Sequence, residues 1–252
     1  MTYIVLFLTG LAAGFVNTLA GGGSVLVLPI LITLGGIPAT VANATNRVAI
    51  LMQSGSGVYH FQRAGKIDLR GKTWPLIAVV IGSAIGTLFA VRVSDRLMEI
   101  LLAIILLLVI TMILVPRRRR QNRRVHPVVE VVVFFGIGLY GGFVQVGVGL
   151  IILAVLNLIE NYDLVRANAF KVTIVFCYTA LSVLIFTISG KIVWRYGLIL
   201  AAGNIIGAWL GVHSAIKSGE RIVKLALVVA AALASLKLLG AIDWLLALLM
   251  QA

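Results

Sequence analysis

Acidic residues are scarce in this sequence: Asp and Glu number 8 among 252 residues, and all charged residues together make up only 12% of the chain. A soluble globular domain carries about a quarter charged residues. Apolar residues reach 61%, with a mean hydropathy of +1.12. A soluble fold of this length could not bury so much apolar surface, whereas a lipid bilayer is itself an apolar solvent. The composition therefore predicts an integral membrane protein and argues against a soluble domain.

Cysteine and histidine are also rare, with one Cys and three His in the chain. Cys177 stands alone, so no intramolecular disulfide can form and no cysteine-based metal site is indicated. Residues 54–57 (Ser-Gly-Ser-Gly) and His60 are similar to an intramembrane serine protease motif, but Gln53 replaces its leading Gly. A His four residues after a Ser on one helix is usually a packing residue. No His-Glu-x-x-His motif is present either. We therefore expect no enzymatic activity, no metal and no cofactor.

Basic residues are plentiful, with 21 Lys and Arg giving a net charge of +13. Six arginines fall between residues 117 and 124, directly after an apolar stretch, and most other basic residues also flank apolar stretches. Membrane proteins place such loops on the cytoplasmic side, against anionic lipid headgroups. A nucleic-acid surface would need aromatic residues interleaved with the basic ones on a folded domain. We therefore expect a multi-pass protein of the bacterial inner membrane, with lipid and not nucleic acid as its partner.

Eight apolar segments approach the roughly 20 residues that a helix needs to cross a bilayer. They cover residues 2–20, 41–61, 74–92, 97–115, 128–146, 167–187, 196–214 and 221–239. Two shorter apolar runs cover 24–37 and 148–159, and a last one at 241–250 has no assigned role. No Lys or Arg precedes the first segment, so we expect it to belong to the fold and not to be a cleaved signal peptide.

The two halves of the sequence repeat each other. A shift of 125 residues places Gly65-Lys66-Ile67 on Gly190-Lys191-Ile192, and Asn43, Arg70, Gly82 and Gly86 on Asn168, Arg195, Gly207 and Gly211. Near the start the shift is 128, which places residues 14–17 (Gly-Phe-Val-Asn) on residues 142–145 (Gly-Phe-Val-Gln). Chance explains matched glycines but not one shift held through such different residues. We predict two membrane repeats, 1–115 and 128–252, joined by a basic cytoplasmic linker at 116–127.

Each repeat contains one helix, a Gly-rich break, a short apolar run and three more helices. If the short run crosses the bilayer, each repeat has five segments, and this odd number inverts the second repeat relative to the first. The loop at 63–72 then lies in the cytoplasm and is more basic than its counterpart at 188–197, as the positive-inside rule requires. The loops at 214–224 and 92–96 obey the same rule. An inverted five-plus-five arrangement is predicted, and a parallel four-plus-four arrangement with re-entrant hairpins is the alternative.

The glycine breaks of the two repeats predict the position of a binding site. Paired, Gly-interrupted segments at equivalent positions are the best sequence indication of a transporter site. A broken helix leaves backbone groups unpaired, which a membrane tolerates only around a cavity or ligand, and helix amino-termini favour anions. We therefore expect residues 20–24 and 147–149 to line a central hollow. For five other glycines, close helix packing is the expected role: Gly14, Gly82, Gly86, Gly207 and Gly211.

Polar residues at the start of the third helix of each repeat complete the predicted site. Residues 43–47 (Asn-Ala-Thr-Asn-Arg) match residues 168–171 (Asn-Ala-Phe-Lys), so each repeat carries one cation inside a helix, where ionisable residues are usually functional. Snorkelling of these cations to the headgroups is the alternative. Because all eight carboxylates fall in loops or near helix ends, the site suits a small anion. The predicted substrate-binding residues are Asn17, Gly21, Gly22, Gly23, Ser24, Asn43, Thr45, Asn46, Arg47, Gln145, Gly147, Gly149, Asn168 and Lys171.

These motifs, in this order and duplicated, resemble those of the sulfite exporter TauE/SafE family of bacterial membrane permeases. The resemblance rests on residues 14–17, 20–24, 42–46 and 65–68 of the first repeat and on 138–149, 168–171 and 190–192 of the second. It implies a permease for sulfur-containing or organic anions such as sulfite, sulfonates or sulfoacetate. The second break is thinner than the first, with Gly147-Val148-Gly149 in place of three glycines.

The sequence therefore predicts an all-α integral membrane protein that transports small anions by alternating access between two repeats. A non-transporting membrane assembly module and an anion channel are the alternatives. The substrate, the direction of transport, the coupling ion and a possible homo-oligomeric state are left open by the sequence.

Overall fold

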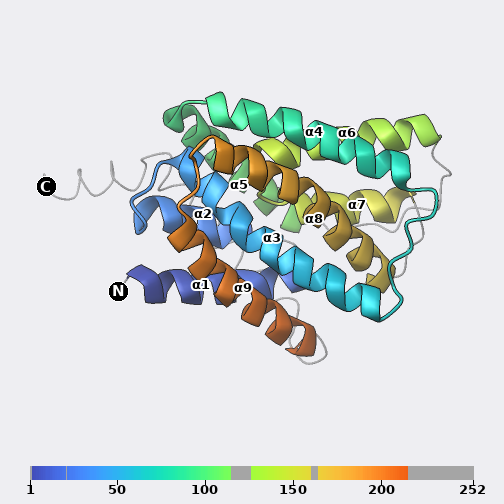
Figure 1. Ribbon diagram of the computed structural model, residues 1–252, viewed down its shortest axis with the longest axis horizontal. Coiled ribbons are helices and arrows are strands. Elements are labelled where there is room, and N and C mark those ends of the chain that lie inside the picture. The colour runs from blue at the N-terminus through green and yellow to red at the C-terminus, as the bar shows by residue number, and fades with distance from the viewer. Residues whose placement is uncertain (1, 21, 115–125, 160–163, 215–252) are drawn as a thin grey trace, which may run out of the picture.

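The computed structural model describes residues 2–20, 22–114, 126–159 and 164–214, and this part of the chain contains helices and loops but no strand (Figure 1). The helices are α1 (Thr2–Ala20), α2 (Ser24–Thr33), α3 (Ala39–Arg63), α4 (Thr73–Arg92), α5 (Asp95–Leu114), α6 (Pro127–Phe143), α7 (Val148–Ile159), α8 (Leu164–Ile188) and α9 (Trp194–Ser214). The all-α prediction is confirmed. The segments predicted at 221–239 and 241–250, and most of the linker predicted at 116–127, lie outside the described residues.

The helices begin and end close to the predicted segments, and the third helices of the two repeats match in length. Helices α3 and α8 both have 25 residues, and their ends differ by the 125-residue shift found in the sequence. Helix α6 ends at Phe143. This is three residues before the predicted end, because the backbone turns extended at Val144.

Helices from the two predicted repeats interlock in one bundle. Helix α4 runs beside α6 along one edge, α1 lies with α9 at the opposite edge, and α3 and α8 pack together between these pairs (Figure 1). In both outer pairs, the first helix of one repeat packs against the fourth helix of the other. The equivalence of these pairs agrees with a repeated unit, and the inverted orientation of the repeats stays a prediction.

Glycines allow the outer helix pairs to approach until backbone meets backbone. A Cβ atom at Gly142 of α6 would lie 2.6 Å from the Cα of Ser83 on α4 and would overlap its carbonyl oxygen. The equivalent pair α1–α9 has the same contact where Gly14 meets the backbone of Asn204. The packing role predicted for Gly14, Gly82, Gly86 and Gly207 is confirmed, since a Cβ at each would overlap a neighbouring backbone carbonyl. Gly211 belongs to α9, but its surroundings lie outside the described part of the structure.

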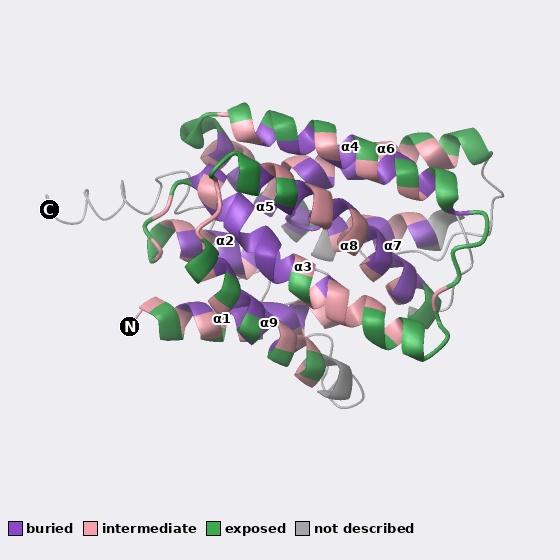
Figure 2. Cartoon of the chain, in the orientation of Figure 1, coloured by how far each residue is buried: buried purple, intermediate pink, exposed green. Residues whose placement is uncertain are grey.

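The outer surface of the bundle is apolar. Large hydrophobic side chains such as Ile81, Phe89 and Trp209 are exposed on it, whereas the buried residues gather along the middle of the bundle, on α3 and α8 (Figure 2). Two helices, Thr73–Arg92 and Val165–Ile188, are long and apolar enough to cross a membrane, with mean hydropathies of 2.1 and 2.0. Exposed apolar side chains on this scale are stable in lipid and not in water.

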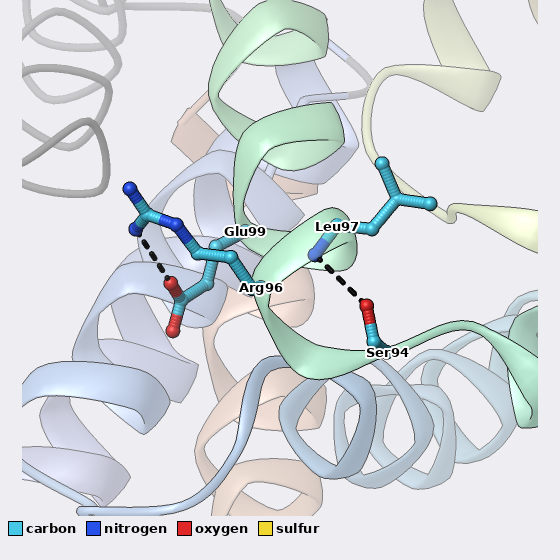
Figure 3. Close-up of polar contacts among 4 residues, drawn as sticks. All are labelled: Ser94, Arg96, Leu97 and Glu99. Carbon is cyan, nitrogen blue, oxygen red and sulfur yellow. Dashed lines mark hydrogen bonds and ion pairs between the residues drawn. The ribbon is translucent and has the colours of Figure 1, made fainter.

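Several charged residues lie at the ends of the helices, among them those at the start of α5. At the start of α5, the backbone N–H of Leu97 donates to Ser94 Oγ (3.4 Å), and Arg96 pairs with Glu99 (3.3 Å) (Figure 3). Asp95 reaches the neighbouring helix α3, where its Oδ1 accepts hydrogen bonds from the backbone N–H (3.2 Å) and the hydroxyl (2.6 Å) of Thr40. Asp95 therefore caps α3, whose own N-cap residue is a proline without a capping side chain.

Replacing Asp95 by Ala is expected to destabilise the protein by about 1–2 kcal/mol, the usual effect of removing a helix cap. Asp95→Asn keeps an oxygen acceptor for Thr40 and should lose less than half of that stability. Reversible unfolding of purified protein in mixed micelles measures both variants. Equal losses for the two would show that the charge of Asp95, and not its hydrogen bonds, supports α3.

Candidate functional site

The first half of α3 is almost completely buried although it carries several polar residues. Asn43, Thr45, Asn46 and Arg47 each have 0% of their surface exposed. Buried polar groups must find partners within the protein, because each one left unpaired costs free energy. Their partners come from four other segments of the bundle: α2, the end of α6, α8 and the loop before α9.

Arg47 binds the end of α6. One terminal nitrogen donates to the carbonyl of Gly141 (2.8 Å) and to Gln145 Oε1 (3.1 Å), and the other donates to the carbonyl of Gly142 (2.7 Å). Its guanidinium also lies over the ring of Phe186 at 5.1 Å. Among the described residues no carboxylate contacts Arg47, so backbone carbonyls, an amide oxygen and an aromatic face balance its charge.

These contacts explain how a helix can end in the middle of the bundle. The last four carbonyls of an α-helix have no partner inside the helix. In α6 the carbonyl of Tyr140 accepts from the N–H of Val144 (2.7 Å), and Arg47 satisfies the next two. Asn43 Nδ2 donates to the last one, at Phe143 (2.8 Å). Asn43 and Arg47, one turn apart on α3, therefore cap the broken helix of the other repeat, and the positive charge lies at the negative end of that helix.

A further set of hydrogen bonds, which we call the polar layer, joins the end of the first helix of each repeat to its third helix. In the second repeat, Gln145 Nε2 donates to the hydroxyl of Tyr178 (2.9 Å). In the first repeat, Asn17 Nδ2 donates to Gln53 Oε1 (2.9 Å). The sequence shifts place Asn17 on Gln145 and Gln53 on Tyr178. The two hydrogen bonds are thus equivalent, although the residue types differ.

Both breaks lie between the first and the second helix of their repeats, but they differ in the residues that they include. The first lies between α1 and α2, where Gly22 and Gly23 are buried and a Cβ at Gly23 would overlap the carbonyl of Ala13; Gly21 lies outside the described residues. The second covers residues 144–147 and ends at Gly147, whose φ of +71° disfavours any other residue. Gly149 belongs to the first turn of α7.

Hydrogen bonds tie two more of the predicted residues to these elements. Asn46 Nδ2 donates to Ser24 Oγ (3.1 Å), at the first residue of α2. Thr45 Oγ1 accepts from the backbone N–H of Val193, just before α9 (3.0 Å). The side chain of Asn168, near the start of α8, is partly buried.

Lys171 differs from the other predicted site residues. It is 6% exposed, and its ammonium group makes no hydrogen bond or ion pair in the described part of the chain. Three atoms of the α3 cluster also lack partners although their residues are fully buried: Asn43 Oδ1, Asn46 Oδ1 and Arg47 Nε. The centre of the bundle therefore holds polar groups that are not all satisfied by the protein.

The described carboxylates lie away from this centre, near helix ends and loops. Glu130 pairs with Lys72 (2.8 Å), Glu99 with Arg96 (3.3 Å), and Asp95 caps α3. Asp68 accepts from the backbone N–H of Arg70 in the loop between α3 and α4 (3.1 Å). The prediction that carboxylates avoid the middle of the bundle is therefore confirmed for these four.

Buried polar side chains, among them Asn46, Arg47 and Gln145, lie beside the two breaks. A recess of about 50 Å³ lies elsewhere, between the α3–α4 loop and the start of α8, and is lined by Lys66, Ile67, Asp68, Arg70, Arg166 and Phe170. None of the residues predicted at the breaks lines this recess, so it does not test the central hollow expected there. A central anion site therefore stays a prediction.

Sequence reasoning missed several residues of the polar centre. Tyr178 and Phe186 on α8 contact Gln145 and Arg47. Thr87 of α4 bonds both the carbonyl of Gly142 (3.1 Å) and the hydroxyl of Ser182 (2.8 Å). Tyr178 could have been found from the repeat, because the shift of 125 residues places Gln53, a polar residue inside an apolar segment, on Tyr178.

An apolar helical bundle with broken helices and a buried polar centre is the architecture of a membrane transporter. This chain belongs to the sulfite exporter TauE/SafE family, which it matches over residues 6–238. A probable membrane transporter protein of Haemophilus influenzae is 27% identical over 224 residues, covering 87% of this chain and 88% of that protein.

Two further relatives carry the same kind of name. The probable membrane transporter protein YfcA of Escherichia coli K12 is 27% identical over 239 residues, covering 93% of this chain and 88% of its own length. The probable membrane transporter protein ORF9 of a Sinorhizobium species is 26% identical, covering 93% and 91%. No solved structure matches the chain. The protein is thus a membrane transporter of the TauE/SafE family.

Proposed function

We propose that this protein is a secondary transporter of small anions, with sulfite, sulfonates and related organic anions as its substrates. One observation carries the proposal: two basic residues, Arg47 and Lys171, are buried in the centre of the bundle, and no described carboxylate contacts either. A buried positive charge is costly unless it is paired. Backbone carbonyls and an amide oxygen already balance the charge of Arg47, whereas an anionic substrate would supply the negative charge that Lys171 lacks. The name of the family supports sulfite as one such substrate.

The proposed transport cycle is alternating access in a multi-pass protein of the bacterial inner membrane, with inverted repeats on either side of a central site. In this proposed cycle, the observed conformation is the closed one, with the polar layer separating the two sides of the membrane. Opening requires one repeat to move against the other. Each of the glycine-packed pairs, α1 with α9 and α4 with α6, joins helices from both repeats, so this movement must change the contact between the two helices of each pair.

Transport of radiolabelled sulfite into proteoliposomes tests the proposal. We expect flux that saturates with sulfite concentration and is accelerated by unlabelled sulfite on the opposite side. At sulfite concentrations below saturation, Arg47→Gln and Lys171→Gln should each reduce the flux by at least about tenfold, since an interaction with a charged group contributes about 1.5–3 kcal/mol. Arg96→Gln, which removes an exposed cation at the start of α5, is the matched control and should keep wild-type flux.

Two other outcomes would contradict this function. Conductance without saturation or trans-stimulation would make the protein an anion channel. Absence of flux for sulfite, thiosulfate, taurine and sulfoacetate, in protein that is folded and correctly inserted, would favour a non-transporting membrane module held by its small-residue faces.

A further inference from the structure

The two buried cations of the polar centre differ in their partners. Both terminal nitrogens of Arg47 are engaged with the end of α6 and with Gln145, at 2.7 to 3.1 Å. Lys171 is almost as deeply buried, yet it has no hydrogen bond and no ion pair among the described residues. An ammonium group is strongly hydrated and requires up to three acceptors, so a buried lysine without acceptors is an incomplete site.

Lys171 lies on the face of α8 that contributes to a buried apolar cluster with α4, α6 and α7. One turn before and one turn after it, Ala167 and Ile174 belong to a buried cluster that also contains Val148 and Ile152 of α7. Two turns further along the same face is Tyr178, which bonds Gln145. Lys171 is therefore two helical turns from Tyr178, a member of the polar layer that includes Gln145.

The repeat shows what Lys171 lacks. Its counterpart in the first repeat is Asn46, which donates to the hydroxyl of Ser24 at the first residue of α2 (3.1 Å). The shift of 128 residues places Ser24 on Ile152, and the shift of 125 places it on Gly149; neither residue has a side-chain acceptor. Where the first repeat pairs an amide with a hydroxyl, the second repeat therefore has a cation and no acceptor side chain at the corresponding position.

We propose that Lys171 binds the negatively charged group of the substrate, and that Arg47 is a positioning residue. The ligand is a small oxyanion such as sulfite or the sulfonate group of an organic anion. In the second repeat, this oxyanion accepts hydrogen bonds from Lys171, as the hydroxyl of Ser24 accepts one from Asn46 in the first repeat. Arg47 acts through α6: it holds the broken end of that helix, and with it Gln145. This division of roles rests on the proposed anion specificity.

The experiment compares Lys171→Gln and Arg47→Gln by two independent measurements, thermal unfolding of purified protein with and without sulfite, and sulfite flux in proteoliposomes. In Lys171→Gln we expect an unchanged or raised melting temperature without sulfite, since an unpaired buried charge has been removed. Sulfite should no longer raise the melting temperature of this variant. The KM for sulfite should increase by about tenfold or more, which corresponds to the loss of one charge-assisted contact. Lys171→Arg should recover part of the affinity.

In Arg47→Gln we expect the reverse: a lower melting temperature without sulfite, a reduced kcat, and a KM close to that of the wild type. Arg96→Gln serves as the control for the loss of a cation and should match the wild type in all measurements.

The inference is overturned if Lys171→Gln keeps the wild-type KM and the stabilisation by sulfite, or if it is destabilised as much as Arg47→Gln or fails to fold. The proposed transport function is tested separately by the wild-type protein. Sulfite binding through Lys171 without flux would overturn transport and support this site. Flux that does not depend on Lys171 would overturn the site and support transport. Neither binding nor flux would overturn both.

Discussion

Replacing Arg47 by Gln is expected to lower the free energy of unfolding by about 2–4 kcal/mol, because a buried carbonyl that loses its partner costs about 1–3 kcal/mol and two such groups are affected. The carbonyl of Gly141 has no other described donor, whereas that of Gly142 keeps the hydroxyl of Thr87 at 3.1 Å. Gln145 also loses a partner. The measurement is reversible unfolding in mixed micelles, followed by tryptophan fluorescence.

Two further variants show whether the cap of α6 is the cause. Arg47→Lys keeps the charge but cannot reach two carbonyls in the forked geometry of a guanidinium, so an intermediate loss of stability is expected. Asn43→Ala leaves the carbonyl of Phe143 without its 2.8 Å partner and should cost about 1–3 kcal/mol. If all three variants are as stable as the wild type, the side chains of α3 do not stabilise the carboxy-terminal end of α6.

Replacing Gly142 by Ala is expected to destabilise the α4–α6 pair by about 1–3 kcal/mol, the usual effect of overpacking. A Cβ there lies 2.6 Å from the Cα of Ser83 and overlaps its carbonyl oxygen. A backbone group cannot rotate away as a side chain can, so the whole of α4 must move. Because α4 and α6 come from different repeats, sulfite flux should fall together with stability.

Gly136→Ala is the matched control for this substitution. It introduces the same methyl group on the same helix, less than two turns away, at a position where a Cβ meets no atom within 4 Å. Ala is about 0.5–1 kcal/mol better than Gly inside a helix, so this variant should be as stable as the wild type or slightly more stable. Equal destabilisation by Gly136→Ala and Gly142→Ala would show that helix propensity, and not the contact with α4, decides the effect.

Helix positions, the duplicated motifs and the all-α membrane class could be predicted from the sequence because they follow from local properties. A run of about 20 apolar residues is stable as a helix in lipid wherever its neighbours lie. Glycines in matched positions likewise predicted close packing correctly at Gly14, Gly82, Gly86 and Gly207.

The roles of the polar residues could not be predicted in the same way. Asn43 and Arg47 were predicted as residues that face a substrate, and in this conformation they face the carbonyls of Phe143 and of Gly141 and Gly142. About 100 residues separate each donor from its acceptor in the sequence. The carbonyl groups of a helix end have no signature in the residue types, because every residue has a backbone carbonyl.

Hydropathy, period and charge are properties of the chain alone, and they were enough to predict the all-α membrane class, the duplicated motifs and the placing of cations without carboxylates in the apolar segments. The partners of those cations depend on the fold: Arg47 caps α6, whereas Lys171 has no partner among the described residues. A buried charge is satisfied by whatever groups the folded helices bring within about 3 Å of it, and this distance depends on packing between helices and not on spacing along the chain.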